Sequence, residues 1–84
     1  MSYNVIVLPV AQREINHLSA ATGRRVLARI AALAANPRPS GCIKLTDRDA
    51  WRIRVGDYRV IYEIDDPTQT VTVAKVRHRR EAYL

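Results

Sequence analysis

Hydrophobic and cationic residues alternate without interruption over residues 51–55 in the second half of the chain. These residues read Trp-Arg-Ile-Arg-Val, and residues 58–64, Tyr-Arg-Val-Ile-Tyr-Glu-Ile, read as the returning strand after Gly56 and Asp57. Such alternation is typical of a strand with one buried face. A glycine in the first position of a two-residue link favours a type II′ turn. We therefore predict a β-hairpin closed by these two residues.

The N-terminal part follows other patterns. Residues 3–8 are rich in β-branched side chains and predict a strand that ends at Pro9, which suits the first turn of a helix. The apolar residues of this first helix recur at helical spacing, and Gly23 is expected to break it. They are Ala11, Ile15 and Leu18.

A second helix is predicted between Gly23 and the Asn-Pro-Arg-Pro-Ser-Gly run at residues 36–41, which ends it. Its apolar stripe is expected to comprise Val26, Ile30 and Leu33, widened by Leu27, Ala31 and Ala34.

Beyond the hairpin, residues 65–67 predict a turn and residues 70–76 a further strand. Val71 and Val73 alternate, but the next valine is Val76, and such a slip of one residue often marks a β-bulge. The order is one strand, a two-helix hairpin, and an antiparallel meander of three or four strands. The chain is therefore predicted to be a single α+β domain over residues 1–84.

Charge and composition narrow the function. The 84 residues carry a formal charge of +6, and a basic balance of this kind indicates a polyanionic partner. A single cysteine, Cys42, allows no internal disulfide and fits a cytoplasmic location. No apolar run is long enough for a membrane span, and no signal peptide is apparent.

The hairpin concentrates the positive charge on one face. Arg54 is predicted to lie directly opposite Arg59, with Arg52 on the same side. The residues of both strands that are expected to pack on the helices are Trp51, Ile53, Val55, Tyr58, Val60, Tyr62 and Ile64. Like charges so opposed destabilise a sheet. Either the arginines are solvated or paired with Glu63 and Asp47, or they form a phosphate site, since guanidinium forks match phosphate oxygens.

The tail adds further cations and an aromatic ring, a combination that suits single-stranded RNA. If the strand continues into the tail, His78 and Arg79 point to opposite faces, so only one of them can join the cluster. The basic and aromatic residues of the tail are Arg77, His78, Arg79, Arg80 and Tyr83.

Residues 51–65 and 71–83, together with Asn36-Pro37 and Lys44-Leu45, resemble the RelE/ParE toxin superfamily. The resemblance implies a RelE-like β-α-α-β-β-β fold and an antitoxin partner. It also implies one of two activities. RelE-type members cleave messenger RNA in the ribosomal A site, whereas ParE-type members act on DNA gyrase.

The resemblance also implies site residues. Arg59 and Arg79 would hold the scissile phosphate, Arg52 and Arg54 would shape the electrostatic field, and Tyr83 would stack on a base or act as general base. Further RNA contacts are expected at Lys44, Arg77, His78 and Arg80, although the alternative of a solvated strand residue is favoured for Lys44. RelE members often carry lysine at the first two positions, and arginine does not give up its proton at neutral pH.

We therefore expect a metal-independent endoribonuclease that uses the RNA 2′-hydroxyl as nucleophile on the 30S ribosome. No metal or cofactor is expected, since the two histidines and the cysteine lie far apart in the sequence. Two alternatives stay open at this point. One is a ParE-like gyrase inhibitor with the same fold, and the other is a basic nucleic-acid-binding module without activity.

Overall fold

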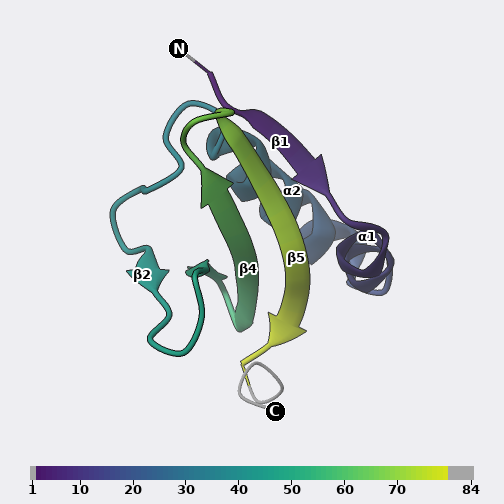
Figure 1. The fold of residues 1–84 in the computed structure, drawn as a ribbon. Coiled ribbons are helices and arrows are strands. Elements are labelled where there is room, and N and C mark those ends of the chain that lie inside the picture. Colours follow the sequence, from purple (N-terminus) through teal and green to yellow (C-terminus); the bar gives the residue numbers. More distant parts are fainter. Residues whose placement is uncertain (1, 80–84) are drawn as a thin grey trace.

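The computed structural model describes residues 2–79, and two helices cover one face of a five-stranded sheet (Figure 1). The elements are β1 (Asn4–Val7), α1 (Pro9–Asn16), α2 (Ala20–Ala32), β2 (Ile43–Lys44), β3 (Trp51–Val55), β4 (Tyr58–Asp65) and β5 (Thr70–His78). The predicted α+β class and order of elements are confirmed. Neither helix in the described part of the chain has the length and apolar character needed to cross a membrane.

The strands lie in the order β1-β5-β4-β3-β2. Strands β2 to β5 form the predicted antiparallel meander, whereas β1 pairs in parallel with β5. The first strand of the sheet is therefore hydrogen-bonded to the last one along the chain, and the two helices form the connection that leads from β1 back over the sheet.

The β3–β4 hairpin has the predicted register. Val55 lies opposite Tyr58, and Arg54 lies opposite Arg59. Gly56 adopts a φ of 60°, the left-handed conformation that the first central position of a type II′ turn requires. Glycine adopts this conformation at no steric cost, so the residue type at the turn fixes which side chains share a face.

The predicted slip in β5 is a β-bulge. Ile61 lies opposite Lys75, but the next residue, Tyr62, lies opposite Val73, so Ala74 is the extra residue on β5. The bulge keeps the valines on either side of it in the core, where each is at most 3% exposed. The strand also continues through residue 78, two residues beyond its predicted end.

The boundary between the helices differs from the prediction. Helix α1 ends at Asn16, and Gly23 does not break it but lies buried within α2. The break is made by Ser19, whose side chain accepts a hydrogen bond from the backbone N–H of Thr22 at 3.3 Å and caps α2. A serine N-cap thus decides the boundary, because the cost of a single glycine, about 1 kcal/mol, does not by itself end a helix.

The apolar stripe of α2 is narrower than predicted. Val26, Ile30 and Leu33 are buried, but Leu27 is 44% exposed and Ala31 is exposed. Residues successive in a helix are rotated by about 100°, and only one side of α2 meets the sheet. The stripe from the helices completes a core whose members from the sheet are Ile53, Val55, Val60, Tyr62, Val71, Val73 and Val76.

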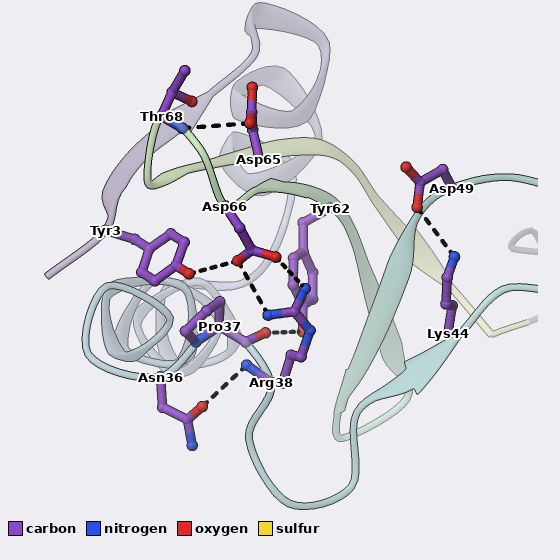
Figure 2. A network of polar contacts seen from close by, with 10 residues as sticks. All are labelled: Tyr3, Asn36, Pro37, Arg38, Lys44, Asp49, Tyr62, Asp65, Asp66 and Thr68. Atoms are coloured by element: carbon purple, nitrogen blue, oxygen red, sulfur yellow. Dashed lines mark hydrogen bonds and ion pairs between the residues drawn. The ribbon is translucent and has the colours of Figure 1, made fainter. Parts of the chain in front are cut away.

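A network of polar contacts joins the N-terminus, the loop after α2 and the β4–β5 turn (Figure 2). Arg38 donates two hydrogen bonds to the carboxylate of Asp66, at 3.3 and 2.9 Å. The Tyr3 hydroxyl donates to the same carboxylate at 2.6 Å. The buried Tyr62 hydroxyl donates to the carbonyl of Pro37 at 2.8 Å. The loop is thereby fastened to the sheet at one end of β4.

The hydrogen bonds from Arg38 and then Tyr3 hold the pKa of Asp66 below its ordinary value. Because its folded-state pKa lies below the unfolded one, Asp66 stabilises the fold above about pH 4, and this contribution is lost as the pH falls through the folded-state pKa. We expect Asp66→Asn to lower the denaturation midpoint at neutral pH but to match the wild type in acid.

The control for this comparison is Asp47→Asn, since Asp47 is 75% exposed and lies 3.9 Å from Arg48. Its difference from the wild type should stay small at every pH. An Asp66→Asn deficit that is equally large at neutral pH and in acid would contradict the role of the carboxylate.

A second stability prediction concerns Gly23. A methyl group added there would meet only the carbonyl oxygen of Ile15, at an ordinary contact distance of 3.8 Å. We expect Gly23→Ala to raise the free energy of unfolding by about 0.5–1 kcal/mol, because alanine favours the helix interior. Chemical denaturation measures this. Gly56→Ala, at φ 60°, should instead lose about 1–2 kcal/mol. A loss at both positions would show that α2 packs too tightly for the methyl group.

Candidate nucleic-acid interface

The face of the sheet opposite the helices carries a row of three arginines across three strands. Arg54 on β3 lies opposite Arg59 on β4, which in turn lies opposite Arg77 on β5. Directly opposed residues share a face and lie about 5 Å apart at their Cβ atoms. The predicted pair is thus confirmed as neighbours, and the strand that follows adds a third guanidinium. We call these residues the arginine row.

A second set of cations lies beside the row. Arg52 and Lys75 flank Ile61 on the same face, in the next line of cross-strand partners. Ile61 is only 5% exposed although it faces away from the helices, because long cationic side chains cover apolar neighbours with their methylene groups. Lys75 was not predicted as a site residue. Only the position of the bulge brings it to this face.

The turn end of the sheet joins Arg59 to Arg79. The guanidinium of Arg59 donates from Nη1 to the backbone carbonyl of Arg79 at 2.9 Å, and the backbone N–H of Arg79 donates to the carbonyl of Asp57 at 2.8 Å. The two predicted phosphate ligands are therefore neighbours in the fold. Tyr83 and Arg80, the other predicted residues of the tail, lie outside the described residues.

His78 does not belong to the arginine row. It pairs with Tyr58, whose ring it meets edge-on with 5.4 Å between the ring centroids. Both side chains line a hollow of about 360 Å³ together with Glu14 and His17, on the side of the sheet that the helices cover. His78 therefore lies on the face opposite the row. Because β5 ends at His78 and Arg79 belongs to the turn that follows, the expectation that these two side chains point to opposite faces of a continuing strand stays a prediction.

Lys44 also lies on the helix-covered face. It pairs with Trp51 on β3, and its ammonium group lies 6.0 Å from the centre of that ring and 3.1 Å from Asp49. Arg38 approaches the same ring at 5.1 Å. Lys44 is therefore separated by the sheet from Arg52 and the row.

One residue of the site, Glu14, was not predicted from the sequence. Glu14 on α1 accepts a hydrogen bond from the backbone N–H of Val76 at 2.8 Å, and its other oxygen forms an ion pair with Nε of Arg77. Glu14 is the only acidic residue among the first 42 of the chain. Its isolation among uncharged and basic residues is the one feature of the sequence that sets Glu14 apart. Nothing in the sequence, however, connects Glu14 with Val76, which lies 62 residues further along the chain.

The negative charges of the outer face gather at its far end. A hollow of about 540 Å³ is lined there by Asp49, Glu63, Asp65 and Asp66, beside three threonines. Glu63 pairs in register with Thr72 and Asp65 with Thr70, so both lie on the same side of the sheet as the arginines. The face is thus positive at the Gly56 turn and negative at the β4–β5 turn.

This arrangement can be compared with the two interpretations of the arginines, which are either solvated or paired with Glu63 and Asp47, or form a phosphate site. Asp47, suggested as a partner, contacts Arg48 instead, and Glu63 lies toward the negative end. Glu14, in contrast, does pair with one member of the row, Arg77. Within residues 2–79, no three His, Cys, Asp or Glu side chains lie close enough together to hold a metal ion.

The opposition of Arg54 and Arg59 should have a measurable cost in stability. We expect Arg54→Gln to raise the free energy of unfolding by about 0.2–1 kcal/mol at low ionic strength, because it removes a like-charge cross-strand pair. Added salt should shrink this gain, since exposed charges are screened. Denaturant titrations at two salt concentrations test it, with Arg29→Gln on α2 as the control. A salt-independent loss of stability would contradict the expected repulsion.

Comparison with known proteins identifies the family to which this fold belongs. The chain matches, over residues 5–83, the family described as the ParE toxin of the type II toxin-antitoxin system parDE. A search of curated proteins gave no match. The RelE–RelB complex of the archaeon Pyrococcus horikoshii contains a chain that is 31% identical, with a TM-score of 0.86, and the match covers 98% of this chain and 100% of that one.

Two further structures agree. The RelBE2 toxin–antitoxin complex of Mycobacterium tuberculosis contains a chain that is 27% identical, with a TM-score of 0.83, over 94% of this chain and 100% of that one. A mutant of the Escherichia coli toxin RelE in the free state, 21% identical, has the same fold, with a TM-score of 0.81 over 99% of this chain and 90% of that one. The resemblance inferred from the hairpin motif is therefore confirmed, and the chain belongs to the RelE/ParE superfamily of toxins from type II toxin–antitoxin systems.

Proposed function

We propose that this protein is a ribosome-dependent endoribonuclease that cleaves messenger RNA in the A site and thereby inhibits translation. The observation that carries the proposal is the arginine row, with Arg52 and Lys75 beside it and Arg79 joined to Arg59. Several cations that converge on one face of a small domain are suited to a phosphate backbone, because each guanidinium presents a rigid fork of donors.

The reaction needs no metal if the RNA supplies its own nucleophile. The 2′-hydroxyl loses its proton and attacks the adjacent phosphorus, the bond to the 5′-oxygen breaks, and that oxygen takes up a proton. The products are a 2′,3′-cyclic phosphate and a 5′-hydroxyl. Negative charge accumulates on the five-coordinate phosphorus, and fixed cations directed at this charge supply the largest share of the rate enhancement.

The proposed roles follow from this distribution of charge. Arg59 and Arg79 hold the scissile phosphate, and Arg52 and Arg54 strengthen the positive field around it. Proton transfer is assigned less directly, because a guanidinium keeps its proton. Tyr83 remains our candidate for the general base.

The same proposal includes an antitoxin. The similar chains from P. horikoshii and M. tuberculosis were both solved as toxin–antitoxin complexes. For this chain we propose a cognate antitoxin in which an acidic and apolar segment covers the outer face and neutralises the arginine row. Both partners, and the ribosome on which the toxin acts, are cytoplasmic.

Inhibition of DNA gyrase is the second candidate function. It is favoured by the family that the chain matches, which is described as the ParE toxin. A gyrase inhibitor acts by binding and needs no cations aimed at a scissile phosphate. The arginine row therefore favours the ribonuclease over this alternative, although the fold is common to both.

One preparation of the protein decides between the two. We expect cleavage of ribosome-bound messenger RNA at defined positions, detected by toe-printing, and unchanged DNA supercoiling by gyrase. Arg59→Ala should lower the cleavage rate by about 10²–10³-fold, the effect typical of losing one donor to a developing negative charge. Arg24→Ala, which removes an exposed arginine of α2, is the matched control and should cleave normally. Inhibited gyrase beside intact messenger RNA would establish the alternative.

A further inference from the structure

The contact between Glu14 and β5 joins the helical layer to the arginine row. The Glu14 side chain is 20% exposed and that of Arg77 is 34% exposed, so the pair is largely shielded from solvent. One carboxylate oxygen of Glu14 accepts a hydrogen bond from the backbone N–H of Val76 at 2.8 Å, and the other contacts Nε of Arg77. Screening by salt is weak for partly buried pairs.

The position of Glu14 follows from the length of β1. This strand pairs with β5 only as far as Val7 and Val73, so the N–H of Val76 faces the side of β5 where β1 has ended. Helix α1 packs against β5 there. Glu14 provides the acceptor that a longer β1 would have provided, and it thereby covers an open sheet edge.

The ion pair changes the electrostatics of the arginine row. Arg77 has a carboxylate in direct contact, and the negative charge of Glu14 offsets its field at the distance of a bound phosphate. Arg54, at the other end of the row, is exposed. The three guanidinium groups are therefore not equivalent, and an RNA phosphate would compete with Glu14 for Arg77.

We propose that Glu14 limits the affinity of the outer face for RNA phosphates by neutralising Arg77. In this assignment Arg77 joins the end of β5 to α1 and is not an RNA ligand, whereas Arg54 and Arg59 bind the phosphate backbone of the RNA. The inference rests on the proposed RNA substrate. It also gives the pair a catalytic consequence, because a cation that binds substrate and transition state equally lowers KM without raising kcat.

The test uses a short single-stranded 2′-O-methyl RNA, which cannot be cleaved because its nucleophile is blocked. In Glu14→Gln the amide oxygen still accepts the N–H of Val76, but the negative charge is lost. We expect this variant to bind about three- to tenfold more tightly at low salt. The slope of log K against log[salt] should steepen by about 0.7, the increment for one more phosphate contact on a single strand. In cleavage assays KM should fall and kcat should not rise.

The double variant Glu14→Gln/Arg77→Gln is the matched control. It removes both charges of the pair, so its affinity and salt slope should equal those of the wild type. Arg54→Gln removes an exposed cation of the same row and should weaken binding and lower the slope by about 0.7. If Glu14→Gln alone fails to fold, the double variant still decides the question.

Two results would overturn the proposal. One is an unchanged affinity and slope in Glu14→Gln, and the other is a double variant that binds as weakly as Arg54→Gln, because Arg77 would then be an ordinary phosphate ligand. Binding to the blocked RNA does not depend on cleavage. The predicted pattern of affinities together with intact ribosomal messenger RNA would therefore remove the ribonuclease proposal and leave the role of Glu14 in place. A wild type that shows no salt-dependent binding would overturn both.

Discussion

The register between β3 and β4 is the constraint on which the outer face depends. Side chains alternate between the two faces of a sheet, so a slip of one residue would move every arginine of β3 into the core and every apolar residue out of it. The turn at Gly56 sets this register, and the buried partners Ile53 and Val60 hold it from the other side. The hydrophobic core therefore does more than stabilise the domain. It also keeps Arg54 directly opposite Arg59, although the repulsion between these like charges is unfavourable.

Much of this architecture could be predicted from local patterns. The alternation of residues 51–55, the glycine-first turn and the displaced valine in β5 each concern residues that are close in sequence, and each predicted a feature that the structure contains. The pair Arg54–Arg59 was predictable for the same reason, since a hairpin converts sequence distance directly into cross-strand pairing.

Apart from the helix boundary, which the local Ser19 cap decides, the features that escaped prediction depend on contacts between distant segments. Leu27 is exposed because it lies on a side of α2 that does not meet the sheet. Helical periodicity alone does not predict which side of a helix packs on the sheet. The pairing of β1 with β5 and the contact of Glu14 with Arg77 join the two ends of the described chain. Whether Glu14 reaches β5 is decided by where β1 stops, and a sequence pattern places strand ends only to within a few residues.

The position of β5 has a consequence for how the protein is made. This strand lies between β1 and β4 in the sheet, yet it follows both of them along the chain. During synthesis β1 has no partner in the sheet, and its strand edge stays unpaired until residues 70–78 have left the ribosomal exit tunnel. The arginine row acquires its third member only at that moment. A nascent toxin built in this way therefore lacks its complete charged face until β5 has emerged from the ribosome that synthesises it.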